Sequence, residues 1–594
     1  MRLIRHEDWY AGRMALVPDR WAKDFARIFR EKAKGEPFNV ASNTWLNRAT
    51  EKLEALRIPL TASDGDICAM ADRCASECMS MSAIAMSNLT SIRESMGRYV
   101  VRWGLVAPDG EDMTDRAAVM RMTDPLWWRR GLRVIHARGL ESEAIARGYV
   151  HRRADIYCSN ETLKRRTQQR RRNADTLASI VATNELGDEF TLAELAEKSV
   201  ANPAIRRGEL MTRIAGFEAV SLGLEHVGEF TTVTCPSRMH SRLSKSGAEN
   251  PTYDGTTPKQ AHQYLGKVWQ RVRAALQRKG VKVYGFRIAE PHHDGCPHWH
   301  FLFFMAPESV KDYRATMSRY FLADSPDERG AQQNRVKFVA IDRKRGTAAG
   351  YIAKYVAKNI DGYGIESDLF GTPALEASAR VEAWASTWGI TQFRQIGGPP
   401  VGVWRELRRM ESGAGGIVEA QAAANAGNWR RYVEVMGGPI VKRKDLPLRV
   451  AHGVKFDVVN VARWVGRWVS ESGLVGAAGR YGEKGMKIVL GVRCMVSGAV
   501  AASRRFVWEL VNKQGKNKGQ AVKTAPWSPV NNCTRGGNES RRKEAIFGDG
   551  VRTKAERIET QPHERPGIDV EFGLCAGGYR DPGRYDLSAH AEGV

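Results

Sequence analysis

The chain has 594 residues and a formal net charge of +24 at pH 7, with 91 lysine and arginine residues against 67 aspartate and glutamate residues. No apolar run approaches the roughly 20 residues that span a bilayer, so the positive balance favours nucleic acid over a membrane as partner. The chain opens without the apolar stretch of a signal peptide, and its nine cysteines include no C-x-x-C pair. We therefore expect a cytoplasmic protein.

Composition predicts four regions in chain order. Residues 1–215 are basic and mostly helical, 216–410 alternate strand and helix patterns, 411–510 form a small helical region with some strand, and 511–594 lose hydrophobic periodicity. We expect the last region to be a disordered basic tail. In the first region, the run Lys164–Arg172 lies in a helix-like stretch, where it forms either a solvated face or a stripe that contacts phosphates.

The second region predicts an antiparallel sheet. Its expected elements are a strand at Phe230–Thr234, a helix from Pro258 to about Gly280, strands at Val281–Glu290 and His298–Phe304 joined by a turn, a helix from Pro307, a strand at Val336–Ile341, and a helix from about Thr347 to Asn359. This order, β-α-β-β-α-β and a helix, is the split β-α-β plan, with two helices on one sheet face. We therefore expect an α+β fold of the ferredoxin/RRM type, whose other face is free to hold a site.

The third expected strand carries half of a metal site. His298 and His300 occupy positions i and i+2, so both imidazoles project from one face. Glu290 ends the partner strand across the hairpin and is the best candidate for a third ligand. Two histidines and a glutamate suit Mg²⁺ or Mn²⁺ acting on a phosphate. An isolated H-x-H is also common as a pair of structural histidines.

The last expected helix presents two phenols side by side. Tyr351 and Tyr355 are at i and i+4, and Lys354 and Lys358 repeat the same spacing on an adjacent face. A protonated phenol is a poor nucleophile, but a nearby divalent cation and lysines favour the phenolate. Attack on a DNA phosphate would leave a tyrosyl-5′-phosphate and a free 3′-OH. Taken alone, such a tyrosine pair is also a common packing motif.

Three segments resemble the motifs of HUH-type rolling-circle replication initiators. They are Phe230-Thr-Thr-Val-Thr-Cys-Pro-Ser237, Glu290-Pro-His-His-Asp-Gly-Cys-Pro-His-Trp-His300 and Tyr351-Ile-Ala-Lys-Tyr355. Over roughly residues 150–410, the chain is similar to the gene A replication proteins of tailed temperate bacteriophages and related prophages. The resemblance implies a site- and strand-specific DNA endonuclease and ligase. It implies metal ligation by His298 and His300 and nucleophilic attack by Tyr351 and Tyr355, while third ligands such as Glu290 vary within the superfamily.

The resemblance also implies partners and leaves alternatives open. The expected substrate is single-stranded origin DNA. Since the chain has no G-x-x-x-x-G-K-[ST] loop, we expect a separate host helicase and replication machinery to unwind the template. The next histidine after His300 is His452, which disfavours a multi-histidine hydrolase centre. A single-tyrosine HUH transposase or relaxase and a non-enzymatic DNA-binding protein remain as alternatives.

Overall fold

The computed structural model describes most of the first 512 residues. The described ranges are 6–36, 39–84, 88–110, 113–344, 346–364, 366–368, 371–411, 413, 415–454, 481, 487–506 and 508–512. The expected tail from residue 513 onward therefore lies outside the described residues. Within these ranges, none of the helices combines the length and the hydropathy that crossing a bilayer requires.

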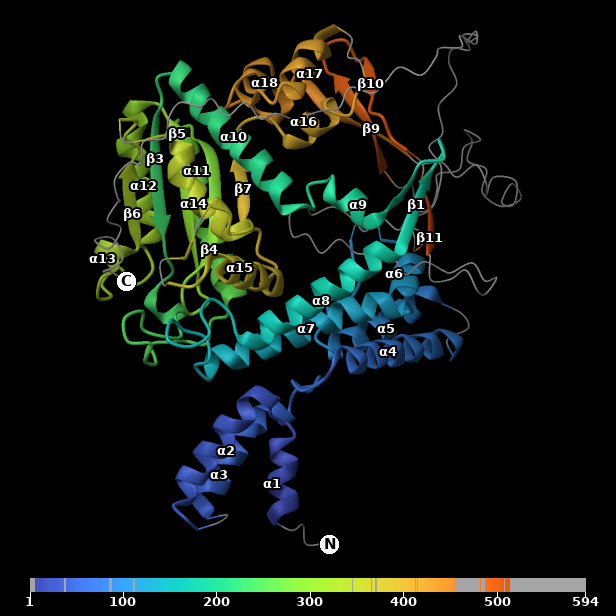
Figure 1. Ribbon diagram of the computed structural model, residues 1–594, viewed down its shortest axis with the longest axis vertical. Helices are drawn as coiled ribbons and strands as arrows, with labels where there is room; N and C mark the ends of the chain where they lie inside the picture. The colour runs from blue at the N-terminus through green and yellow to red at the C-terminus, as the bar shows by residue number, and fades with distance from the viewer. Residues whose placement is uncertain are drawn as a thin grey trace.

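The N-terminal region is helical, as its composition predicts. Its helices are α1 (His6–Met14), α2 (Asp19–Ala33), α3 (Val40–Glu54), α4 (Asp64–Ile84), α5 (Leu89–Arg102), α6 (Asp115–Met122), α7 (Pro125–Ala146) and α8 (Asn160–Ser179). Figure 1 shows α1–α3 as a lobe of their own, while α7 and α8 run side by side toward the rest of the molecule.

A small sheet and a long helix connect this region to the next. Strands β1 (Ile180–Asn184) and β2 (Glu189–Thr191) precede α9 (Leu192–Glu197) and α10 (Pro203–Gly223). β1 also pairs with β11 (Trp508–Asn512), so the expected small C-terminal region reaches back to the N-terminal one. The boundary expected after residue 215 falls inside α10.

The second region contains a five-stranded sheet in the order β6-β3-β5-β4-β7. The strands are β3 (Val227–Val233), β4 (Tyr284–Pro291), β5 (Pro297–Met305), β6 (Val336–Ala340) and β7 (Phe393–Ile396), and every neighbouring pair is antiparallel. The first four strands, with α11 (Pro258–Arg278) and α12 (Val310–Phe321), follow the expected order along the chain. A mixed α and β architecture with an antiparallel sheet is therefore confirmed, and β7 is an additional edge strand.

Both faces of this sheet are covered, so the expectation of a free face is wrong. The helices α11 and α12 pack on the face that carries Trp299, Phe301 and Phe303. The opposite face, with Leu302 and Phe304, packs against α10 and α14 (Ala348–Ile360). All eight residues of β4 are buried, since apolar side chains occur at both parities of the central strands and each face needs a cover. The sheet face that carries the histidines is therefore covered by helices.

Most of the remaining helices and strands extend this second cover, whereas Trp384 and Trp388 of the first helix among them belong to the cluster on the α11 face. Helices α15 (Ala374–Trp388), α16 (Val401–Leu407), α17 (Val418–Asn425) and α18 (Trp429–Val435) precede strands β8 (Leu448–Val454), β9 (Lys487–Cys494) and β10 (Val500–Ala502). Trp404 and Trp429 contact each other with ring centroids 5.0 Å apart. Trp429 also lies edge-on to Phe217 of α10, which joins this helical layer to the sheet.

Candidate metal centre and tyrosine helix

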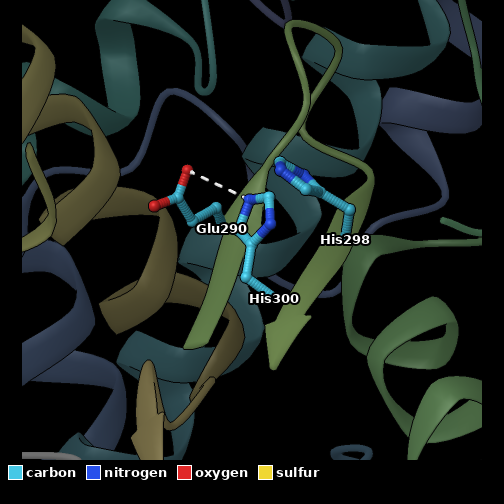
Figure 2. Close-up of side chains that lie close together, drawn as sticks. All are labelled: Glu290, His298 and His300. Atoms are coloured by element: carbon cyan, nitrogen blue, oxygen red, sulfur yellow. Dashed lines mark ion pairs between the residues drawn. The ribbon is translucent and has the colours of Figure 1, made fainter. Parts of the chain in front are cut away.

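The β4–β5 hairpin places three potential ligands together. Glu290 pairs in register with His298, and Ile288 pairs with His300. Glu290, His298 and His300 each offer one ligand atom, and these atoms all lie within 4.8 Å of one another. Figure 2 shows the carboxylate and the two imidazoles converging from the two strands. The sequence predicted this grouping from strand parity and the hairpin alone.

The hydrogen bonds around these residues leave ligand atoms without partners. Thr232 on β3 lies opposite His300, and its Oγ1 is 2.9 Å from His300 Nδ1. Among the described residues, His300 Nε2 is buried without a hydrogen-bond partner, and it lies 4.0 Å from Glu290 Oε2. His298 Nδ1 is likewise buried and has no partner in the described part of the chain. Orphaned nitrogens beside a buried carboxylate fit a divalent cation, with Thr232 orienting one imidazole from outside.

The surroundings keep the imidazoles neutral. Burial lowers the pKa of His300 to about 4, against the opposing effect of Glu290. Burial, followed by the neighbouring His292 and His300 rings, lowers the pKa of His298 well below its ordinary value. A neutral imidazole is the form that binds metal. The two histidines are therefore in their ligating form at neutral pH.

Helix α14 carries the tyrosines over this centre. Thr347 caps its N-terminus by accepting a hydrogen bond from Gly350 N at 2.9 Å. A buried stripe at four-residue spacing holds the helix on the sheet; it consists of Ala348, Ile352, Val356 and Ile360. Tyr351 and Tyr355 form the neighbouring stripe, with ring centroids 6.5 Å apart. The phenols are therefore positioned by the packing of α14 against β3, β4 and β5.

The two tyrosines differ in their distance from the ligands. Tyr355 lies 4.5 Å from His300 between ring centroids. Both tyrosines contact Phe230 of β3, and Tyr351 remains 39% exposed. Burial raises the pKa of both phenols, and at Tyr355 the neighbouring Tyr351 and Glu290 add to that rise. The described side chains alone thus favour neutral phenols.

Lys358 contacts the carboxylate of Glu290 and not the rings of Tyr351 and Tyr355. Its Nζ lies 3.3 Å from Glu290 Oε2 and 4.9 Å from the ring centroid of Tyr157. The side chain of Lys354 lies outside the described residues. Of the two lysines expected at the site, the structure therefore places Lys358 beside Glu290, where its charge faces the ligand set.

Sequence reasoning missed a buried amide between the two halves of the site. Asn359 is 1% exposed. Its Nδ2 donates to Glu290 Oε1 and, at 2.6 Å, to the backbone carbonyl of Tyr355. Gln392 Nε2 donates to Asn359 Oδ1 at 3.1 Å, which orients the amide. Asn359 follows Tyr355 by four residues, as Tyr355 follows Tyr351, so the spacing could have placed Asn359 on the same helix face as the tyrosines.

Two further neighbours were not identified from the sequence. Glu218 of α10 accepts hydrogen bonds from the backbone amides of Ala348 at 2.7 Å and Ala349 at 3.0 Å, and so fixes the first turn of α14. The His292 ring lies 4.1 Å from that of His298, and its Nε2 is buried without a partner. His292 lies in the turn between β4 and β5, and it packs directly on a predicted ligand.

Comparison with known proteins identifies a family. A model described as bacteriophage replication gene A protein matches residues 66–363. The replication gene A protein of Escherichia phage 186 is 39% identical over 440 residues, covering 71% of this chain and 60% of that protein. Its counterpart from Escherichia phage P2 is 35% identical over 441 residues, covering 70% and 55% respectively.

A third relative carries a name that includes an activity. A probable replication endonuclease from a prophage-like region of Salmonella typhimurium is 29% identical over 512 residues, covering 82% of this chain and 60% of that protein. The chain thus spans no more than about three fifths of the length of these relatives. No solved structure matches the chain.

Proposed function

We propose, from the premise that the chain belongs to the bacteriophage replication gene A protein family, that it initiates replication by cutting one strand of an origin in phage or prophage DNA. The observation that carries this proposal is the contact between Tyr355 and His300, with ring centroids 4.5 Å apart. It sets a potential nucleophile against a potential metal ligand. The replication endonuclease named among its relatives supports the same reaction class.

The centre fits a Mg²⁺ or Mn²⁺ ion held by His298, His300 and Glu290. Such an ion supplies a Lewis acid that polarises the scissile phosphate and stabilises charge on the departing oxygen. The phenolic oxygen of one tyrosine attacks phosphorus and loses its proton, and the bond from phosphorus to the 3′-oxygen breaks. The electron pair of that bond stays on the 3′-oxygen, which becomes a 3′-OH. The 5′-phosphate remains esterified to the tyrosine.

The second tyrosine makes the reaction repeatable. The phosphotyrosine ester retains the energy of the phosphodiester, so a 3′-OH can attack it and rejoin the strand without ATP. While Tyr355 holds one end, Tyr351 remains available for a second cut at the regenerated origin. This alternation would support rolling-circle replication in the bacterial cytoplasm, with single-stranded origin DNA as substrate and a separate host helicase as partner. The strand order of the sheet is consistent with the HUH superfamily.

A covalent-adduct assay tests the proposal. Labelled single-stranded oligonucleotides that tile both strands of the phage or prophage genome are incubated with the protein and Mg²⁺ or Mn²⁺, then separated on denaturing gels. We expect an adduct on the 5′ end of the cut strand that disappears in His298→Ala and His300→Ala. Tyr363→Phe is the control, because that tyrosine is exposed and lies just beyond α14.

Three results would contradict the proposal. An adduct that persists in the double variant Tyr351→Phe/Tyr355→Phe would exclude these residues as the nucleophiles. A wild-type protein that binds the oligonucleotides but forms no adduct on any of them would support a non-enzymatic DNA-binding protein. If loss of one tyrosine abolishes the adduct, while loss of the other changes neither the first adduct nor the second cut at the regenerated origin, the result would support a single-tyrosine transposase or relaxase.

A further inference from the structure

The basic run on α8 divides into two sets in the structure. Arg165 donates from Nη2 to the carbonyls of Leu60 and Ala62, at 3.4 and 3.1 Å. Arg166 donates from Nε to both carboxylate oxygens of Glu382, at 3.0 and 3.1 Å. These two arginines hold α8 against the loop before α4 and against α15. Their guanidinium groups are used in intramolecular hydrogen bonds, so these two arginines are not available to a partner.

The second set faces solvent. Lys164, Arg170 and Arg171 are exposed, and the described part of the chain offers them no ion pair or hydrogen bond. Arg172 is also exposed, but its Nη2 lies 3.7 Å from Asp64. Only Thr162 is fully buried among the residues of α8. Within the described residues, three cations on a sparsely buried helix thus form no ion pair.

This helix starts beside the candidate metal centre. Ser159 caps it, and buried Glu141 accepts hydrogen bonds from Ser159 N at 3.0 Å and from Ser159 Oγ at 2.5 Å. Two residues earlier, the Tyr157 ring lies 4.9 Å from Nζ of Lys358, which contacts Glu290. A 20-residue helix extends about 30 Å. Figure 1 shows α8 leading away from the sheet toward β1.

The chemistry of the exposed face selects the form of DNA. Single-stranded DNA is usually held by cations together with aromatic side chains that stack on bases. Helix α8 contains no aromatic residue, and its other exposed residues are Thr167, Gln168, Ala174, Asp175, Thr176 and Ala178. Such a face can pair with phosphates but offers nothing for unstacked bases. It therefore suits the backbone of a double helix.

We propose that Lys164, Arg170 and Arg171 bind the phosphate backbone of duplex DNA flanking the cut. The inference rests on the proposed function for the presence of a cut, but the contact itself needs neither metal nor tyrosine. α8 would serve as a sequence-independent arm that aligns the duplex with the centre at its N-terminal end. Recognition of the cut sequence would remain with the catalytic region.

Salt dependence of binding tests this contact. The full chain is titrated with a 30-base-pair duplex of mixed sequence over a range of NaCl concentrations, as wild type and as Lys164→Gln/Arg170→Gln/Arg171→Gln. We expect the slope of log affinity against log salt to shrink by about 2.7, since each phosphate contact contributes about 0.9. The control is Lys267→Gln/Arg271→Gln/Arg278→Gln on α11, which removes the same charge from three exposed residues on another helix. It should lower the slope by less than about 1.

An unchanged slope in the α8 variant, or an equal loss in the α11 variant, would overturn the proposal. A single-stranded 30-mer in place of the duplex should reveal a smaller difference between wild type and the α8 variant; an equal or larger one would assign the face to single strands. The α8 variant should still form the covalent adduct on short single-stranded oligonucleotides. His298→Ala should lose the adduct and keep the duplex slope, so failure of the catalytic proposal and failure of the α8 proposal give different results.

Discussion

Asn359 ties Glu290 to Tyr355 by donating one amide group to both the carboxylate and the backbone carbonyl. A potential metal ligand and a potential nucleophile therefore hydrogen-bond to the same buried side chain, although they lie 65 residues apart in the sequence. Any displacement of α14 along the sheet would change the orientation of the carboxylate.

Asn359→Ala should weaken metal binding. The variant removes the donor that orients Glu290, and losses of such outer hydrogen bonds lower metal affinity by roughly 10–100-fold. Titration with Mn²⁺ followed by electron paramagnetic resonance measures this change. Gln421→Ala is the control, because Gln421 is also a buried amide and donates to the Met410 carbonyl far from the site. Equal Mn²⁺ affinity in Asn359→Ala and wild type would show that the amide does not orient a ligand.

Lys358→Met should bind metal more tightly and cut DNA more slowly. Its ammonium lies 3.3 Å from Glu290 Oε2 and competes with a cation for that oxygen. Removing it should raise Mn²⁺ affinity by about tenfold, equivalent to ~1.4 kcal/mol. Adduct formation should fall if the ammonium, once a bound metal displaces it from Glu290, pairs with the scissile phosphate. A variant with weaker Mn²⁺ binding would contradict the competition; Lys279→Met, at an exposed ion pair, is the comparison.

Tyr355 should carry the first adduct. Its ring lies 4.5 Å from His300, whereas Tyr351 is more exposed and contacts Phe230. In Tyr351→Phe, peptide mass spectrometry after one turnover should find the nucleotide on Tyr355 at nearly wild-type yield. In Tyr355→Phe, the initial yield should fall by at least about tenfold, given the sensitivity of in-line attack to position. The reverse pattern would assign the first cut to Tyr351.

Glu218→Ala should loosen the first turn of α14. The carboxylate accepts hydrogen bonds from two backbone amides there. Loss of such a helix cap costs about 1–2 kcal/mol of unfolding free energy. Adduct formation should fall with it, because Tyr351 lies in that turn. Glu194→Ala removes the capping-box carboxylate of α9 and should lower stability without lowering adduct yield. If both variants lose adduct equally, the effect reflects global destabilisation.

Buried His136 should make the protein less stable in acid. Burial lowers its pKa to about 4, and its Nε2 lies 3.2 Å from the Leu60 carbonyl. As pH falls from about 6.5 toward 4, the unfolded chain takes up this proton first, so unfolding free energy is lost over that window, by at most about 3 kcal/mol. In urea unfolding experiments with EDTA present, His136→Gln should make the unfolding free energy less dependent on pH. His452→Gln, an exposed position, should not, and an unchanged slope in His136→Gln would refute the assignment.

The sequence predicted the elements that carry their own periodic signal. Strand parity separated His298 and His300 from Trp299, and four-residue spacing paired Tyr351 with Tyr355. The cover over the histidine face was not predicted, because α10 begins more than 20 residues before β3 and nothing local links it to the sheet. Leu302 and Phe304, at the same parity as the histidines, were an unused sign that this face is buried.

Side-chain partners were harder to predict than side-chain faces. Lys358 was expected beside the phenols, since spacing alone places it one turn beyond Tyr355. Its contact with Glu290 depends on how α14 crosses the hairpin, which only tertiary packing determines. Strand β7 was missed for a related reason: Phe393–Ile396 contains two polar residues among four and becomes a strand only by pairing with β4.

The pairing of β1 with β11 has a consequence for the order in which the protein is made. Ile180 is opposite Asn512, so this small sheet cannot be completed until the ribosome has added more than 300 further residues. The central five-stranded sheet, whose last strand ends at Ile396, can form well before that. Synthesis would therefore complete the central sheet first and add β11 beside β1 afterwards, when the contact between Arg166 and Glu382 can already hold α8 against α15.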